Sequence, residues 1–194
     1  MKKFIINESD IVDIDTYIKN RSSIKKNIFE IKKNRRVQVG PHATFYFESY
    51  DTMLYQIQEM IYIERGGRDQ LLDELKAYNP MVPNGRELVA TLMFEIGNEN
   101  KRKEFLNSAG GIENKIYFSL DKKVIVKALP EDDTERTNEY GKTSSVHFLH
   151  FNFENYIEEF KNSSDITIGF EHKNYKHTAT IDESVKESLV KDFK

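Results

Sequence analysis

The sequence predicts an α+β fold in which a mainly antiparallel sheet, built from hairpins, carries several helices on one face. Segments with the apolar alternation of β-strands occur in adjacent pairs, and neighbouring pairs of this kind fold as antiparallel hairpins. Other segments place apolar residues three and four positions apart, which is the helical period. The chain has 194 residues and no internal repeat. This length suits one core, so we expect a single domain over residues 1–194.

The first predicted helix follows two serines, Ser22 and Ser23, which are favourable N-cap residues. Ile24, Ile28 and Ile31 then form one apolar stripe at helical spacing. We expect the helix to turn this stripe toward the core and its charged residues toward solvent.

A hairpin should follow, with strands over 35–40 and 42–49 that turn at Gly40–Pro41. Alternation places Phe45 and Phe47 on one face of the second strand. The opposite face is polar and carries His42, Thr44, Tyr46 and Glu48.

The strongest predicted helix covers residues 51–65, with Asp51 as its cap and two glycines after its end. Ile57 should be among its most buried residues. Gln58 and Glu59 lie beside this apolar seam. Gln58 either lies on an exposed edge or is a buried amide that bonds to backbone groups at the end of the sheet. Glu59 either lies on an exposed edge or lines a polar pocket.

The rest of the chain continues the alternation of helices and strand pairs. The predicted elements are a helix over 68–78, a strand over 87–96, a helix over 98–111, a hairpin over 114–120 and 122–129 that turns at Asp121, a strand over 145–153, a helix over 155–164, a hairpin over 166–172 and 177–181, and a helix over 182–193.

Composition excludes several kinds of chemistry. There are no cysteines, which excludes disulfides, cysteine nucleophiles and thiolate zinc sites. The net charge of -3 creates no strong field for nucleic acid or for an acidic membrane. The N-terminus has only a short apolar run, and no segment approaches the length of a membrane span. We therefore expect a cytoplasmic protein without a membrane partner.

No recognisable catalytic motif is present, so whether the protein is an enzyme stays open. The stretch "YGKTS" resembles a phosphate-binding loop, but Arg136 stands where that loop needs a glycine, five positions before Gly141. The Gly-x-Ser-x-Gly, His-Glu-x-x-His and Gly-x-Gly-x-x-Gly patterns do not occur. We predict no catalytic residue.

Residues 19–36 are strongly basic. Their cations are Lys19, Arg21, Lys25, Lys26, Lys32, Lys33, Arg35 and Arg36, against the single acidic residue Glu30. This segment is either a contact for nucleic acid or an acidic partner, or the solvated face of an amphipathic helix. We favour the solvated face, and nucleic-acid binding through this helix is the third of our predicted functions.

Several spaced stretches resemble a bacterial family of about this length. They are "GPHATFYFES", "YQIQEM", "ER", "AYNPMVP", "SSVHFLHF" and "NYKH". The family is catalogued as domain of unknown function three-five-zero-one, and the resemblance spans most of the chain. It implies no activity and no catalytic residue. It implies a loose association with gene neighbourhoods that contain rubrerythrin-like and iron–sulfur oxidoreductase proteins.

The histidines are the best candidate ligands. His147 and His150 should point to opposite faces of one strand, which makes them a poor pair. His172 and His177 differ, because the hairpin folds back between them and should place the two residues directly opposite each other. Opposed residues of this kind have Cβ atoms about 4.5–5.5 Å apart, close enough for both imidazoles to hold one metal or ligand.

A metal at this pair would need a third ligand, drawn from His147, His42, Glu59 or Glu64. Imidazole and carboxylate ligands favour iron, manganese or zinc. The alternative is that His172 and His177 close the end of the core and bond to backbone and water.

The predicted function is that of a small accessory protein that binds a divalent metal or small ligand at the histidine end of the sheet, with a link to redox chemistry. The alternative is a cofactor-free module that docks a partner protein. The acidic connection over 131–139 should be solvated.

Overall fold

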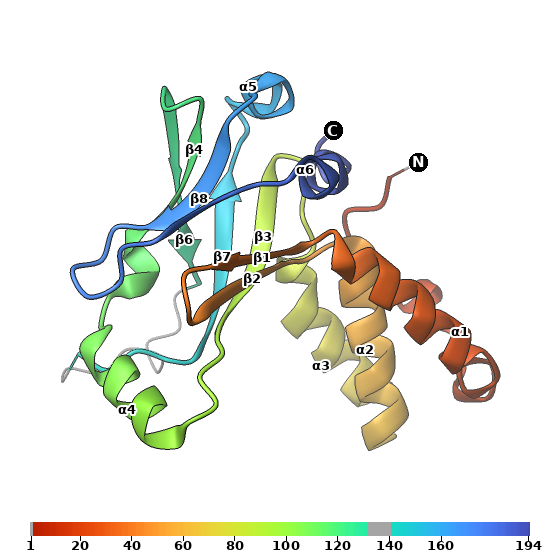
Figure 1. Ribbon diagram of the computed structural model, residues 1–194. Helices are drawn as coiled ribbons and strands as arrows, with labels where there is room; N and C mark the ends of the chain where they lie inside the picture. Colours follow the sequence, from red (N-terminus) through yellow and green to blue (C-terminus); the bar gives the residue numbers. More distant parts are fainter. Residues whose placement is uncertain (1, 132–140) are drawn as a thin grey trace.

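The computed structural model describes residues 2–131 and 141–194, which form two antiparallel sheets with helices around them (Figure 1). Sheet A contains, in spatial order, β1 (Arg36–Val39), β2 (Ala43–Phe47), β3 (Glu87–Phe94), β7 (Val146–Asn152) and β6 (Leu129–Pro130). Sheet B contains β5 (Val124–Lys127), β4 (Ile116–Leu120), β8 (Ile166–Phe170) and β9 (Thr178–Thr180). The predicted class, α+β with antiparallel pairing, is confirmed.

Six α-helices surround the sheets in the described parts of the chain. They are α1 (Ile14–Lys33), α2 (Tyr50–Glu64), α3 (Gly67–Tyr78), α4 (Glu99–Ser108), α5 (Ile157–Asn162) and α6 (Glu183–Val190). Short 3-10 turns occupy Glu8–Asp10, Asn79–Met81 and Ile112–Lys115. None of these helices combines the length and the apolar character that a bilayer span requires.

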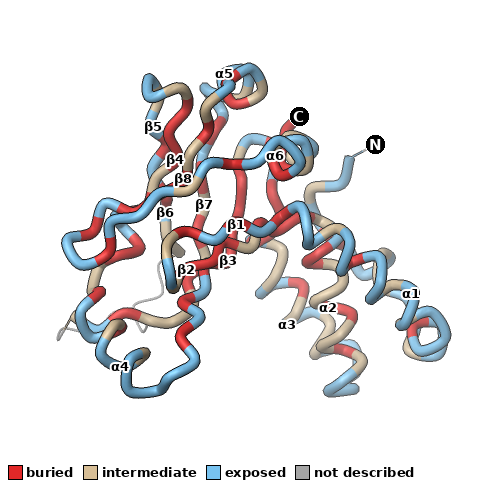
Figure 2. Tube along the Cα trace, in the orientation of Figure 1, coloured by how far each residue is buried: buried red, intermediate tan, exposed pale blue. Residues whose placement is uncertain are grey.

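The sequence predicted one sheet with helices on one face, whereas the strands form two sheets. After β5 the chain leaves sheet B, and at Leu129 it pairs with His150 of β7 in sheet A. This crossover lets the strands form two sheets that bury their apolar faces against each other. Figure 2 shows buried strands in both sheets, whereas α1 is largely exposed.

Aromatic side chains fill the main core between the sheets. Phe118 of β4 lies with its ring centroid 4.8 Å from Phe151, 5.5 Å from Phe153 and 5.9 Å from Phe47. Tilted and edge-to-face rings at such distances add to the free energy of apolar burial. The predicted inward face of β2 is confirmed, since Phe45 and Phe47 belong to this core. Side chains from α4, α5 and α6 close its open sides.

A second apolar cluster lies on the other face of sheet A, where α1, α2 and α3 gather (Figure 1). Met53, Ile57 and Ile61 of α2 pack there with Val89 of β3. The side chain of Ile57 has 0% of its surface exposed, which confirms its predicted burial.

Replacing Ile57 with alanine should therefore lower the free energy of unfolding by about 2–5 kcal/mol, because it removes buried methyl groups and leaves a cavity. Denaturant titration measures this loss. Ile63→Ala in the same helix is the matched control, because Ile63 is 65% exposed and its loss should change stability little. A loss below about 0.5 kcal/mol for Ile57→Ala would contradict the packing.

Two helices begin earlier than the sequence predicted. Asp13 caps α1 by accepting a hydrogen bond from the Thr16 amide at 2.9 Å, so Ser22 and Ser23 lie inside that helix. Ser49, and not Asp51, caps α2 by accepting from the Thr52 amide. In each case a better-placed side-chain acceptor stands upstream of the predicted cap.

Candidate functional site

The hairpin that carries His172 and His177 has a different register from the predicted one. Gly169 pairs with Thr178, and an isolated bridge joins His172 to Tyr175. His172 therefore faces Tyr175 across a turn, while the carbonyl of His177 accepts from the Phe170 amide at 2.9 Å. The prediction that the two histidines oppose each other is wrong by two residues.

Tyr175 explains this register. Its side chain is buried, and its hydroxyl donates to the Val39 carbonyl at 2.6 Å. The same oxygen accepts from the amides of His42 and Ala43, each at 3.1 Å. The hairpin is thereby tied to the β1–β2 turn. Gly40 permits the close approach, since an added Cβ there would lie 2.6 Å from the His177 ring.

The candidate histidine ligands have separate surroundings. His172 is buried and its Nδ1 accepts from the Asn174 amide at 3.3 Å, whereas His177 is exposed and packs edge-on against Tyr175. His42 is half-buried, with its ring centroid 5.3 Å from that of Phe105. His147 is buried. Within residues 2–131 and 141–194, no three His, Asp or Glu side chains are grouped to hold a metal ion. Metal binding at this end stays a prediction.

Glu59 is part of the contact between α1 and α2. Its two carboxylate oxygens accept from Nε and Nη2 of Arg21, each at 2.8 Å, and the Tyr17 hydroxyl donates to it as well. The neighbouring side chain of Gln58 makes two hydrogen bonds to the backbone of Val12. Its Oε1 accepts from the Val12 amide at 3.0 Å, and its Nε2 donates to the Val12 carbonyl at 3.1 Å. Of the two arrangements predicted for Gln58, the structure shows the buried amide, and its backbone partner is Val12 rather than a residue at the end of a sheet. The hydrogen bonds of Glu59 are those of a structural ion pair.

This pair should make stability depend on pH. The bidentate Arg21 contact holds the pKa of Glu59 below its usual range. A carboxyl with a lowered folded pKa contributes stability that is present above its unfolded pKa of about 4.3 and is lost as pH falls through the folded value. Glu59→Gln should cost about 1 kcal/mol near neutral pH, a figure reduced for partial exposure of Arg21.

Urea titrations from about pH 2 to 7 test this. The variant should lose less stability than the wild type as pH falls. Glu64→Gln is the control, because Glu64 lies exposed at the end of the same helix. If the free energy of unfolding of the wild type and of Glu59→Gln falls equally as pH decreases, the structural role of the Arg21–Glu59 ion pair would be contradicted.

The basic segment 19–36 divides into exposed and buried members. Lys25, Lys26, Lys32 and Lys33 are exposed on α1. Arg35 differs, because only 4% of its side chain is exposed. The prediction of a solvated face is therefore wrong for Arg35.

Replacing Lys25, Lys26, Lys32 and Lys33 together with glutamine should change the free energy of unfolding by less than about 0.5 kcal/mol, since exposed ion pairs contribute little. Denaturant titration measures this, and circular dichroism checks the fold. If the wild type binds DNA or RNA in a salt-sensitive way and this folded variant does not, the segment is a nucleic-acid contact after all.

Most of the acidic connection predicted over 131–139 lies outside the described residues. Its first residue, Glu131, stands 3.7 Å from Nε2 of His150, whose Nδ1 lies 3.1 Å from Glu87. The hydrogen bond to Glu87 raises the pKa of His150.

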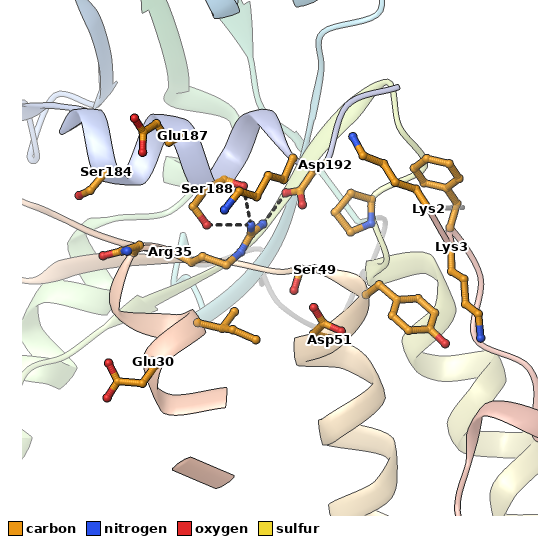
Figure 3. Close-up of a pocket in the computed structure, with 16 residues that line it drawn as sticks. Lys2, Lys3, Glu30, Arg35, Ser49, Asp51, Ser184, Glu187, Ser188 and Asp192 are labelled. Atoms are coloured by element: carbon orange, nitrogen blue, oxygen red, sulfur yellow. Dashed lines mark hydrogen bonds and ion pairs between the residues drawn. The ribbon is translucent and has the colours of Figure 1, made fainter. Parts of the chain in front are cut away.

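Arg35 and Asp192 form a buried ion pair in the wall of an open cleft of about 600 Å³ (Figure 3). The cleft lies among the N-terminal residues, the end of α1, the first turn of α2 and helix α6. The exposed fraction of the Asp192 side chain is only 9%. Burial raises the pKa of this carboxyl, the charges of Arg35 and Lys2 oppose the shift, and Asp51 adds a smaller rise.

Five contacts saturate the Arg35 guanidinium. Nε donates to the Phe47 carbonyl at 2.9 Å, and Nη2 donates to the Glu48 carbonyl at 2.7 Å and to Asp192. Nη1 donates to the carbonyl and hydroxyl oxygens of Ser188, at 3.2 and 3.4 Å. Arginine has five N–H groups, so Arg35 has none left for a ligand. Its role is to fasten α6 to the end of β2.

The charges of the lining are balanced. The cations are Lys2, Lys3, Arg35 and Lys191, and the anions are Glu30, Asp51, Glu187 and Asp192. The sequence did not predict this cleft, although the alternation of residues in β1 indicates one of its members. Arg35 lies two and four positions before Val37 and Val39, which are both buried. Residues at this spacing share one face of a strand, so the side chain of Arg35 is expected to point inward.

Comparison with known proteins identifies relatives of unknown function. A search of curated proteins found no match. The crystal structure of a protein of unknown function from Burkholderia pseudomallei is similar, with 34% sequence identity and a TM-score of 0.88, over 97% of this chain and 99% of that one. The profile of the DUF3501 family, proteins of unknown function, matches residues 5–193. The chain therefore belongs to the DUF3501 family.

Proposed function

We propose that this protein is a binding protein that holds a small polar molecule in the cleft between α1, α2 and α6. The observation that carries this proposal is the buried Arg35–Asp192 pair in the cleft wall. Removing charges from water costs several kcal/mol per ion. A carboxyl with a raised pKa that lies in a cleft is a candidate for a functional site. The volume of about 600 Å³ falls within the range of small-molecule sites.

The chemistry of the lining supports binding. Ser49 and Asp51 at the start of α2 face the space beside the Arg35–Asp192 pair (Figure 3). Hydroxyl, carboxylate and ammonium groups surround one space, and such groups orient polar ligands by hydrogen bonds and charge. This location differs from the histidine end that the sequence favoured, where the described residues supply no third ligand for a metal.

The docking alternative has weaker support. The most exposed large apolar side chains lie on separate elements, with Ile63 on α2, Phe29 on α1 and Leu129 on β6. Apolar residues scattered singly are normal on protein surfaces and identify no partner.

Fragment titration followed by ¹H–¹⁵N NMR tests the proposed function. Fragments that bind should shift the amide resonances of Ser49, Asp51 and α6. Ser184→Tyr should block these shifts, since Ser184 lines the cleft and is exposed. Ser23→Tyr, on the exposed surface of α1, is the matched control and should leave them unchanged. Fragments that bind only elsewhere, or none that bind, would refute the proposal.

A further inference from the structure

A second, smaller hollow lies between α1 and α2 and borders the cleft. Its volume is about 230 Å³, and we call it the crevice. Asp51 lines both the cleft and the crevice, so the two meet at the first turn of α2. An ion pair links them as well, because Lys3 lines the cleft and pairs with Asp10, which lines the crevice. The apolar and aromatic side chains of the crevice are Val12, Tyr17, Ile24, Ile28, Leu54 and Tyr55.

The two helices carry the cleft and the crevice along shared faces. On α1, Ile24 and Ile28 line the crevice and Ile31 lines the cleft. These residues stand at i, i+4 and i+7, the spacing of one helix face. Ile28 is buried, whereas Ile24 and Ile31 are only half-buried, so the ends of this isoleucine stripe keep apolar surface open to the two hollows. On α2, Asp51 and Leu54 stand at i and i+3 and lead from the cleft into the crevice in the same way.

The crevice differs from the cleft in its chemistry. Polar groups in its wall are engaged by the protein, since the Tyr17 hydroxyl donates to Glu59 and the Gln58 amide is bonded to the backbone of Val12. The wall therefore presents mainly hydrocarbon and ring surface. An apolar cavity of about 150 Å³ can bind benzene. A volume of about 230 Å³ is thus sufficient for a phenyl ring or a branched alkyl group.

We propose that the ligand of the cleft is amphipathic, with a polar group in the cleft and an apolar group, of the size of a phenyl ring or a branched alkyl chain, in the crevice. This inference rests on the proposed function and names its ligand class. The apolar group lies between Ile24 of α1 and Leu54 of α2, and the two parts of the ligand join beside Asp51. Burial of the apolar group removes its surface and that of the crevice from water, which adds affinity that a purely polar ligand lacks.

Matched pairs of small molecules test this inference. Acetamide, acetate and ethylamine are each compared with the compound that adds a phenyl ring, namely phenylacetamide, phenylacetate and 2-phenylethylamine. NMR titration of the full chain gives the affinities and the sites. In at least one pair, the phenyl compound should bind about tenfold or more tightly than its small partner. It should shift the amide resonances of Ser49 in the cleft and of Ile24 in the crevice. Toluene, which supplies the apolar group alone, should bind more weakly than this compound.

A bulky substitution assigns the apolar end of the ligand. Ile24→Trp should fill the crevice and lower the affinity of the phenyl compound to about that of its small partner, whose own affinity should stay unchanged. Asn27→Trp repeats the test at an exposed residue of the crevice lining, in case Ile24→Trp does not fold. Ile18→Trp is the matched control, because Ile18 is 46% exposed on the same helix and stands outside both linings. It should change neither affinity.

Three results would overturn the inference. They are phenyl compounds that bind no more tightly than their small partners in all three pairs, shifts confined to the crevice, and unchanged affinity for the phenyl compound in the folded tryptophan variants. Toluene that binds as tightly as the phenyl compounds would also overturn it, because the crevice would then be a separate apolar site, such as one for a side chain of a partner protein. None of these results affects the proposed function if other fragments shift the resonances of the cleft. Failure of the fragment screen at the cleft would refute both.

Discussion

Arg35→Met should lower the free energy of unfolding by about 3–5 kcal/mol, because removing one member of a buried ion pair leaves the other charge uncompensated. The variant would leave Asp192 buried without its cation. It would also leave the carbonyl oxygens of Phe47, Glu48 and Ser188 without their arginine donor. Buried acceptors without donors add to the cost.

The loss should depend on pH in a defined direction. Burial already raises the folded pKa of Asp192. A raised pKa contributes stability that is fully present below the unfolded value of about 3.9 and is lost as pH rises through the folded value. Without Arg35 the folded pKa rises further. The penalty in Arg35→Met should therefore be largest near neutral pH and smaller in acid, where Asp192 is protonated in both states.

Urea titrations near pH 7 and pH 4 measure this difference. The double variant Arg35→Met with Asp192→Asn should recover part of the stability at neutral pH, because it removes the orphaned charge. Arg36→Met is the matched control, since Arg36 is exposed and pairs with Glu95 at 3.6 Å. A loss in Arg35→Met no larger than in Arg36→Met would contradict the structural role.

Phe118→Ala should cost about 3–5 kcal/mol, the range for removing a buried aromatic side chain from a core. Phe118 has 0% of its surface exposed and lies where β4 of sheet B meets the inner face of sheet A. Its ring also lies 6.2 Å from that of Phe160 in α5. Because side chains of two sheets and a helix converge there, the space left by the ring cannot close easily.

Thermal and denaturant unfolding measure this loss. Phe29→Ala is the control, because Phe29 is exposed on α1 and its removal should change stability little. If Phe118→Ala cost less than about 1 kcal/mol, the two sheets would not pack through this ring.

The local elements were largely predictable from sequence. The β1–β2 hairpin was predicted from alternation and from Gly40 and Pro41, and its strands pair antiparallel from Arg36–Tyr46 to Val39–Ala43. The turn at Asp121 was also predicted, and Asp121 and Lys122 both have positive φ there. These features follow from contacts between residues close in the chain, which a local pattern records.

The candidate site was less predictable, because its contacts join residues far apart in sequence. Arg35 and Asp192 are separated by 157 positions, and no local pattern pairs them. Alternation indicates that Arg35 points inward with Val37 and Val39. It does not indicate which carboxylate meets the guanidinium, or that a cleft remains open beside the pair.

By itself, the sequence determined the strands, the helices and the antiparallel class of the fold, because periodicity and turn residues act over a few positions. The tertiary structure decided the division into two sheets, the register that sets His172 against Tyr175, and the placing of Arg35 beside Asp192. The two sheets form because they bury their apolar faces against each other, and the register and the placing of Arg35 share another physical reason. Tyr175 binds the β1–β2 turn and Arg35 binds α6, so long-range hydrogen bonds select among arrangements that the local pattern permits equally.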